Sequence, residues 1–237
     1  MNPTPEGRRD QISAGLDDVR RRIATAADAA GRDPAAVTLV VVTKFFPPSD
    51  VRLLAELDVT DIGENRHPEA ADKMAECIDL GLRWHFIGGL QSNKAAAIGS
   101  YADVVESVDR VKLVNALNRG AHQRSHPVDV LLQVSLDPPG RAGRSGAEVD
   151  DLPALADAVE SARMLRLRGL MAIAPLEEDP GSAFERLRGI HRSFVAQWPD
   201  ASWLSAGMSN DFEAAIGAGA THVRVGSAIL GPRPSIK

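Results

Sequence analysis

The first residue with a candidate chemical role is a lysine at the end of the most apolar run of the chain. Lys44 directly follows Val40-Val41-Val42-Thr43. A lysine at the end of a buried strand is costly unless its amine is used, because burial disfavours the charged form. The alternative is a lysine whose stem lies along apolar surface while its amine reaches solvent. Position alone leaves both interpretations open.

Small residues that can present backbone N–H groups follow two later apolar runs. Gly207-Met208-Ser209 precedes a helical pattern at 211–216, and Gly226-Ser227 ends the other run. Each glycine alone is typical of an ordinary turn, but two such turns together are typical of a phosphate site. A phosphate site combined with an available lysine amine fits a phosphorylated aldehyde held as a Schiff base. Pyridoxal 5′-phosphate (PLP) is such a molecule.

The partner of the PLP pyridine nitrogen decides which chemistry the cofactor supports. Aspartate or glutamate keeps the ring protonated and makes it a strong electron sink, whereas arginine leaves it unprotonated and a weaker sink. Arg224 lies two residues before Gly226, on the same face of its predicted strand. We therefore expect Arg224 to face the pyridine nitrogen and to mute the reactivity of the cofactor.

Eight short β-branched runs predict the strands that position these residues: 37–43, 61–64, 83–87, 104–108, 128–135, 165–172, 202–205 and 222–225. Apolar residues at helical spacing, such as Val51, Leu54 and Leu57, lie between them. The run 37–43 is nearly continuous, which is typical of a parallel strand covered on both faces. These features predict a closed (β/α)8 barrel, in which functional residues gather at the C-terminal ends of the strands.

A further amphipathic segment precedes the first predicted strand. Ile12, Leu16, Val19 and Ile23 have helical spacing and predict an N-terminal helix over the closing seam of the barrel. The alternative fold, an open doubly wound sheet, lacks its glycine-rich phosphate motif after the first strand. We expect residues 1–237 to form one domain, with at most a short helix after the last strand.

Composition excludes several classes of protein. The 237 residues are 44% hydrophobic and 25% charged, which is a globular balance, and the net charge of −5 disfavours nonspecific nucleic-acid binding. The single cysteine, Cys77, excludes intramolecular disulfides and multi-cysteine metal sites, and we expect it to be buried. His122 and His126 lack the glutamate of a zinc-binding HExxH motif, so no metal is expected. Neither a secretory signal nor a membrane span is present, which predicts a cytoplasmic protein.

The sequence resembles the YggS/PROSC family of pyridoxal phosphate homeostasis proteins over nearly its whole length. The matching segments are VVVTKFFP, IGENRHPEAADK, WHFIGGLQSNK, RLRGLMAIAP and LSAGMSNDFEAAIGAGATHVRVGSAILG. The resemblance implies a barrel like that of alanine racemase, without a C-terminal β domain. It also implies a monomer that regulates the intracellular PLP pool.

The resemblance carries specific residues. It implies that Lys44 holds PLP covalently, that Arg224 faces the pyridine nitrogen, and that other residues surround the cofactor: Asn65, Met208, Ser209, Gly226 and Ser227. Ser209, Gly226 and Ser227 would hold the phosphate. A further family signature comprises His85, Gln91, Asn93 and Lys94, whose role is either structural or ligand-facing.

The chain also departs from the family pattern. Arg66-His67 follows Asn65 where an aromatic residue is frequent, which could alter the edge of the site. Ser227 replaces a commoner threonine but keeps the hydroxyl. Arg144 stands where lysine is usual, so the positive charge is kept while lysine chemistry at this position is in doubt.

The first functional hypothesis is a noncatalytic protein that buffers, delivers or senses PLP, with apo PLP-dependent enzymes as candidate partners. Amino-acid racemisation needs two bases, and in alanine racemase the second is a tyrosine from a further domain of a partner subunit. The only tyrosine here, Tyr101, is expected at the lower end of the barrel. His85 could substitute, but histidines at strand ends more often satisfy hydrogen bonds of the core.

Two alternatives remain open. One is a PLP-dependent enzyme with weak amino-acid racemase activity, which would exchange the substrate Cα proton. The other is a barrel enzyme acting on phosphorylated sugars, which needs the phosphate site but no Schiff base. That protein would be colourless, whereas bound PLP gives a yellow one.

Overall fold

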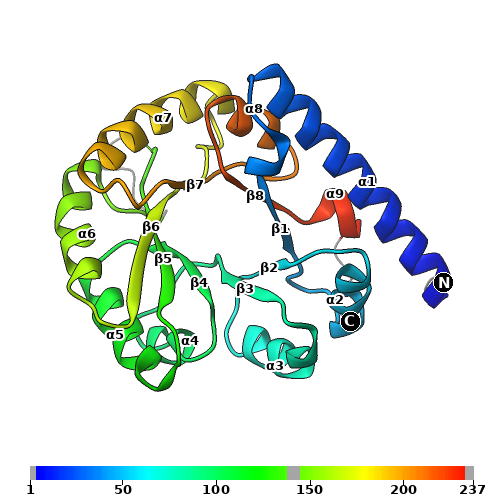
Figure 1. Cartoon of the computed structure of the whole chain (residues 1–237), viewed down its shortest axis with the longest axis horizontal. Helices are drawn as coiled ribbons and strands as arrows, with labels where there is room; N and C mark the ends of the chain where they lie inside the picture. The colour runs from blue at the N-terminus through cyan, green and yellow to red at the C-terminus, as the bar shows by residue number, and fades with distance from the viewer. Residues whose placement is uncertain (1–3, 138–144, 233–237) are drawn as a thin grey trace.

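The computed structural model describes residues 4–137 and 145–232. Its strands are parallel and close a barrel in sequence order (Figure 1). They are β1 Thr38–Val42, β2 Asp61–Glu64, β3 Arg83–Phe86, β4 Val104–Val108, β5 Val128–Gln133, β6 Leu165–Met171, β7 Trp203–Ser205 and β8 His222–Val225. β8 pairs with β1, with Arg224 opposite Val40. The predicted (β/α)8 barrel is confirmed.

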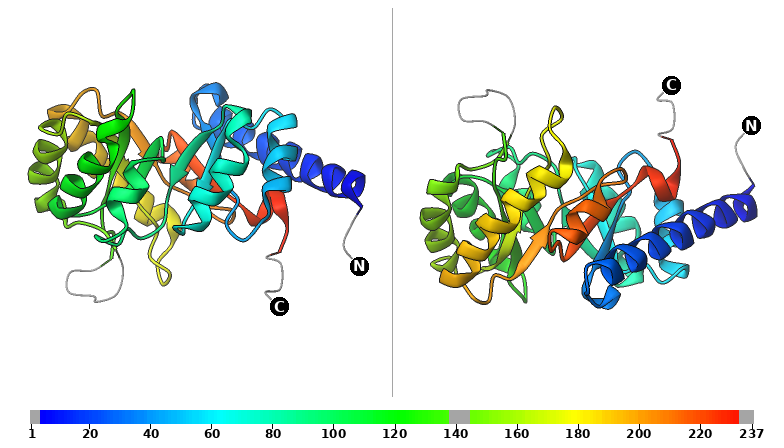
Figure 2. Two further views of the ribbon diagram at one scale, coloured as in Figure 1. Left: turned by 90° about the horizontal axis from the view of Figure 1, so that it is seen from below. Right: turned by 90° about the horizontal axis from the view of Figure 1, so that it is seen from above.

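An α-helix follows each strand on the outside of the barrel (Figures 1 and 2). The α-helices are α1 Pro5–Ala29, α2 Pro48–Glu56, α3 Glu69–Glu76, α4 Ala95–Gly99, α5 Val111–Gly120, α6 Leu152–Glu160, α7 Pro180–Gln197, α8 Phe212–Gly217 and α9 Ser227–Leu230. Short 3-10 helices lie at η1 Pro34–Ala36, η2 Ile78–Leu80, η3 Ala121–Gln123 and η4 Val149–Asp151. Within the described residues, no helix is both long and apolar enough to cross a membrane.

The predicted strands coincide with the observed ones apart from their ends. The largest difference is in β5, which ends at Gln133 instead of residue 135. Val134 forms an isolated bridge with Ala147, because the chain there leaves the barrel and pairs with the returning loop. Cys77 is buried between α3 and η2, as expected. The β-branched sequence pattern thus located the strands, while contacts with other segments of the chain set the residues at which they end.

The N-terminal helix α1 lies across the outside of the barrel beside α8 and α9 (Figure 1). Its apolar residues Ile12, Leu16 and Val19 are fully buried and share one cluster with Val41 of β1 and other seam residues. This helix covers the closing seam, as predicted. The contact is close because residue 15 is glycine, where a Cβ would lie 2.6 Å from a backbone oxygen of α9.

The apolar core lies mainly between the strands and the helices. One cluster underlies α4 to α7, and the other underlies α1, α2 and α8. The interior of the barrel, by contrast, contains buried charge, including Glu106, His85 and Arg224. Charged groups removed from water are stable only when they are paired and hydrogen-bonded. The polar interior therefore holds its members in fixed geometry directly below the C-terminal ends of the strands.

Candidate functional site

A cavity of about 500 Å³ opens at the C-terminal ends of β1, β7 and β8. We call it the mouth. Six of the seven predicted site residues line it: Lys44, Met208, Ser209, Arg224, Gly226 and Ser227. The loop after β6, at Ile173 and Ala174, completes its wall. The structure therefore brings together an amine, a guanidinium and two hydroxyls in one cavity.

A tight turn directly after β1 positions Lys44. The N–H of Phe46 donates to Thr43 O at 3.0 Å and closes the turn. Phe45 has a φ of 71°, a conformation uncommon for a residue other than glycine. Its N–H donates to Glu69 Oε1 at 3.1 Å. The first turn of α3 thus holds the backbone next to Lys44, a role for Glu69 that the sequence did not reveal.

A buried lysine behind the same turn joins β1, β2 and α3. Lys73 Nζ donates to Thr43 O at 2.9 Å and to Glu64 Oε1 at 2.5 Å. Thr43 Oγ1 also donates to Glu64 Oε1 at 2.7 Å. Burial raises the pKa of Glu64, although the charge of Lys73 opposes this shift. The pair anchors the end of β1 from which Lys44 projects.

The loops after β7 and β8 meet on the other side of the mouth. Ser227 Oγ donates to Ser209 Oγ at 3.2 Å, so the two hydroxyls lie side by side. Gly207 has a φ of 89° and packs against α8, which turns the chain sharply before Met208. The N–H of Met208 donates to Asp211 Oδ1 at 2.6 Å. A Cβ at Gly226 would lie 3.0 Å from a backbone oxygen of β1, so glycine there lets the end of β8 lie close against β1.

Arg224 is buried at the base of the mouth, where its guanidinium is held on two sides. Nη1 donates to Ser205 Oγ at 2.6 Å and Nη2 donates to Ala172 O at 2.9 Å. Nη1 also lies 3.7 Å from Glu106 Oε2. Burial lowers the pKa of Arg224 and the charge of Glu106 opposes this shift. A guanidinium remains protonated in proteins, so Arg224 is a permanent donor.

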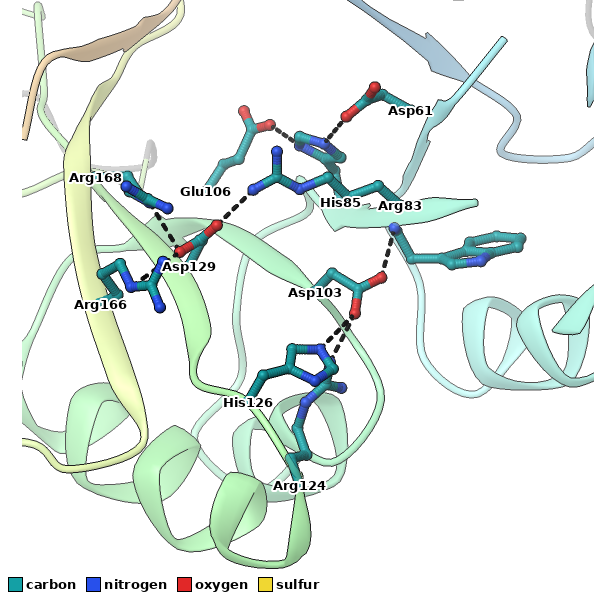
Figure 3. A network of polar contacts seen from close by, with 11 residues as sticks. Asp61, Arg83, His85, Asp103, Glu106, Arg124, His126, Asp129, Arg166 and Arg168 are labelled. Atoms are coloured by element: carbon teal, nitrogen blue, oxygen red, sulfur yellow. Dashed lines mark hydrogen bonds and ion pairs between the residues drawn. The ribbon is translucent and has the colours of Figure 1, made fainter. Parts of the chain in front are cut away.

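A hydrogen-bonded chain, the buried belt, continues from Arg224 through the barrel interior. It comprises Ser205, Glu106, His85 and Asp61 (Figure 3 shows the last three). Ser205 Oγ donates to Glu106 Oε2 at 2.6 Å, and His85 Nδ1 lies 2.7 Å from Glu106 Oε1. His85 Nε2 lies 2.9 Å from Asp61 Oδ1. Both ring nitrogens of His85 thus have partners inside the barrel. Of the two roles left open by the sequence, structural or ligand-facing, this arrangement favours the structural one.

The charges of the buried belt stabilise one another. Burial would raise the pKa of Glu106, but the hydrogen bond and charge of His85 outweigh it and the pKa falls to about 2. Burial would lower the pKa of His85, yet its bonds to Asp61 and Glu106 raise it. His222 has no such carboxylate partner, so burial lowers its pKa to about 4. The belt thus carries an ionised Glu106 below a charged Arg224.

The opposite end of the barrel carries a separate cluster of ion pairs. Asp129, at the start of β5, contacts Arg83, Arg166 and Arg168 (Figure 3). The guanidinium groups of Arg83 and Arg168 also lie over the ring of Trp203. One carboxylate contacts three guanidinium groups, so the charges do not cancel, and the contacts tie β3, β5 and β6 together beside a cavity that Arg83, Asp129 and Arg166 line.

Asn65 is the one predicted site residue that the structure places outside the mouth. It lines a neighbouring cavity together with Arg66 and His67, the two residues that depart from the family pattern. Tyr101 does not reach the mouth either, since its ring stacks on His67 at 5.9 Å between centroids. Arg144 lies outside the described residues.

A cavity of about 690 Å³ lies outside the barrel between α2 and α3. It shares Phe46 with the mouth but contains none of the predicted site residues. The described part of the chain has no group of three or more histidine, cysteine or acidic side chains placed to hold a metal. The mouth is the cavity on which the predicted chemistry converges.

Known proteins resemble this chain along almost its full length. Residues 15–234 match the model of the alanine racemase N-terminal domain. A pyridoxal phosphate homeostasis protein from Pseudomonas aeruginosa is 45% identical over 225 residues, covering 94% of this chain and 96% of the relative. The protein of that name from Mycobacterium tuberculosis is 41% identical over 243 residues, covering 95% and 94%.

Solved structures share the same barrel. PipY of Synechococcus elongatus, solved with PLP bound, superimposes with a TM-score of 0.79 at 33% identity, covering 93% of this chain and 100% of PipY. Alanine racemase from Corynebacterium glutamicum has a TM-score of 0.66 at 15% identity, covering 97% of this chain and 63% of the racemase. At that identity the racemase shares the fold alone.

Proposed function

Because this chain belongs to the family of pyridoxal phosphate homeostasis proteins, we propose that its mouth binds PLP and that the protein acts in PLP homeostasis. The observation that carries the proposal is the convergence of Lys44, Arg224, Ser209 and Ser227 on one cavity. Its volume of about 500 Å³ lies within the usual range of small-molecule sites. PLP is bound in the related PipY structure, which supports the assignment.

The donor set of the mouth fits the functional groups of PLP. The hydroxyls of Ser209 and Ser227 supply donors for the phosphate, beside Gly226 in the wall of the mouth. Arg224 supplies a permanent donor for the pyridine nitrogen, and its bond to Ser205 fixes its direction. Lys44 supplies the amine. Met208 lies at the rim, while the contact of Asn65 with the cofactor stays a prediction.

Covalent attachment is proposed at Lys44. Its deprotonated amine attacks the PLP aldehyde carbon, a C=N bond replaces the carbonyl, and the carbonyl oxygen leaves as water. When bound, PLP supplies an electron sink, which an unprotonated ring makes weaker. Lys73, Glu64 and Glu69 hold the backbone on either side of Lys44 and so fix where its amine emerges.

We further propose that PLP is carried without robust catalysis. None of the described residues that line the mouth is a histidine, tyrosine or cysteine. Two of the described acidic residues line the mouth: Asp211 accepts the N–H of Met208, and Glu178 is hydrogen-bonded to Arg186, which lowers the pKa of its carboxyl and makes it a weak base. A second base facing Lys44 across the mouth is therefore poorly provided, which favours a carrier over a racemase.

Attachment is tested by borohydride reduction of the PLP-loaded protein followed by peptide mass spectrometry. We expect a phosphopyridoxyl group on Lys44, and we expect Lys44→Ala to lose both this adduct and the yellow colour. Lys112→Ala, which changes an exposed lysine of α5, is the matched control and should keep both. An adduct on a different lysine, or a colourless wild-type protein after incubation with PLP, contradicts the proposal.

The carrier role has two tests of its own. Amino-acid enantiomers incubated with the loaded protein in deuterated water should show no deuterium at Cα, whereas exchange would favour weak racemase activity. Transfer of PLP to an apo-enzyme is then timed against free PLP in the presence of a trapping agent. Faster, trap-resistant transfer supports delivery, and slow release supports storage.

A further inference from the structure

A second, smaller cavity lies beside the loops that follow β2 and β3. We call it the side cavity; its volume is about 240 Å³, and its wall includes Asn65, Arg66, His67, Gln91 and Lys94. It shares no lining residue with the mouth. Gln91 and Lys94 belong to the family signature whose role the sequence left open. Apart from Asn65, whose contact with PLP stays a prediction, the side cavity therefore collects polar residues that do not line the mouth.

The charge of this wall has one sign. Arg66 and Lys94 are cationic, and no aspartate or glutamate is among the described residues that line the side cavity. Lys94 is half-buried and forms no ion pair with a described acidic residue. Most other basic side chains near the barrel ends, such as Lys73, have a carboxylate partner. An anion in the cavity would supply the missing counter-charge.

The polar groups of the wall are also incompletely satisfied. Asn65 Oδ1 and His67 Nδ1 are buried without a hydrogen-bond partner. Such groups are rare in folded proteins because each carries a desolvation cost. Rotation of the Asn65 amide exchanges its oxygen for an NH₂ donor, and Nδ1 of a neutral histidine donates in one tautomer. Asn65 and His67 thus leave unsatisfied polar atoms behind the wall of the side cavity, and they reach a ligand there only when their side chains turn toward it.

We propose that the side cavity binds a small oxoanion, either a phosphate or a short carboxylate. Lys94 and the Gln91 amide supply donors to the side cavity, and no aspartate or glutamate is among the described residues of its wall, which suits an acceptor with several oxygens. Its volume admits a small ion but is about half that of the mouth. Lys44 does not line the side cavity, so the proposal of an anion site is tested separately from the proposal of PLP attachment.

The test is an NMR titration of the full chain saturated with PLP. Inorganic phosphate and acetate are added in separate series at constant ionic strength, with chloride as the reference salt. The backbone amide of Gly89 reports on the side cavity, whose wall it joins, and that of Gly226 reports on the mouth. We expect a saturable shift at Gly89 and not at Gly226. The series that saturates identifies phosphate or carboxylate as the ligand.

Lys94→Gln should lower the affinity for the anion by about tenfold or more, which is the usual effect of losing a charged hydrogen bond. Lys112→Gln is the matched control, since Lys112 is exposed on α5 and should leave the affinity unchanged. Gln91→Ala provides a second variant at an exposed position and should weaken binding less. Arg66 is unsuitable for this comparison because its guanidinium also lies over the ring of Phe45, next to Lys44.

Shifts at Gly89 that stay linear, or that chloride reproduces, overturn the proposal, because they indicate salt effects and water in the cavity. An equal affinity in Lys94→Gln and wild type also overturns it. Saturation at Gly226 instead of Gly89 places the anion in the mouth and contradicts the side-cavity site. None of these outcomes alters the lysine adduct by which PLP attachment is judged.

Discussion

Glu106→Gln removes the central charge of the buried belt while keeping the size and shape of the side chain. In the native protein the Glu106 carboxylate bonds to His85 and Ser205 and lies 3.7 Å from Arg224. Among the described residues, glutamine leaves Arg224 with no carboxylate in an ion pair and leaves His85 with Asp61 as its one acidic partner. We expect a large loss of stability and a less well-directed Arg224.

The magnitude follows from the pKa of Glu106, which is lowered from 4.5 to about 2. At about 1.4 kcal/mol per pKa unit, the ionised form contributes on the order of 3 kcal/mol to folding at pH 7. Removing one partner of a buried ion pair typically costs about 3–5 kcal/mol, which is the same range. Because the folded pKa is depressed, this stability is complete above about pH 4.5 and is lost as the pH falls toward 2.

Urea unfolding of wild type and Glu106→Gln at pH 7 and at about pH 3 measures both features. The difference in unfolding free energy should be about 3 kcal/mol at pH 7 and less than half of that near pH 3. Glu106 also raises the pKa values of His85 and His222, so the substitution lowers both, and NMR titration of the two imidazoles in each protein measures that part of the difference. Glu185→Gln, which changes an exposed partner of Arg188, is the control and should shift stability by less than about 0.5 kcal/mol.

The reasoning is refuted if Glu106→Gln costs less than about 1 kcal/mol at pH 7. It is also refuted if the difference is the same at both pH values. Either result would mean that Glu106 is protonated in the folded protein and that neutral hydrogen bonds hold the belt.

Three more outcomes are expected. Lys73→Met should lower the free energy of urea unfolding by about 3–5 kcal/mol, because it leaves Glu64 buried and unpaired. Adding Glu64→Leu should recover most of the loss, and no recovery would argue against a buried ion pair between the two residues. Gly207→Ala should cost about 1–3 kcal/mol of stability and weaken PLP binding, because φ is 89° and a Cβ would lie 2.7 Å from the backbone of α8. The control is Gly217→Ala, whose Cβ meets open space, and equal melting temperatures of the two variants would contradict this prediction. His222 should titrate by NMR near its pKa of about 4, and since the unfolded chain binds that proton more readily, stability should fall as the pH drops from about 6.5 through 4.

Much of the mouth was predictable because parallel barrels bring the C-terminal ends of their strands to one rim. Lys44, Ser209 and Ser227 each follow a strand that the β-branched pattern located, and they line one cavity. Asn65 also follows its strand, yet it lies in the side cavity. A residue just past a strand end can turn inward or outward, and local sequence does not specify which.

The supporting residues were missed for a different reason. Glu106 lies within a strand whose other residues are buried, and a charge in such a run was a signal that could have indicated a buried partner. Its partners His85 and Ser205 come from β3 and β7, which lie far from Glu106 in sequence. Lys73 lies three residues after Ala70 and four before Cys77, which is the spacing of a buried helix face, so this lysine too carried a signal of a buried partner.

The sequence by itself determined the alternation of strands and helices, the covering helix α1 and the set of residues at the strand ends. Each of these depends on the order of neighbouring residues and on the fixed periods of helix and strand. Only the tertiary structure decided that Asn65 lies apart from Lys44 and that Glu106 lies below Arg224. Barrel closure sets these distances between residues remote in the chain, and the cost of burying charge then selects which of them pair.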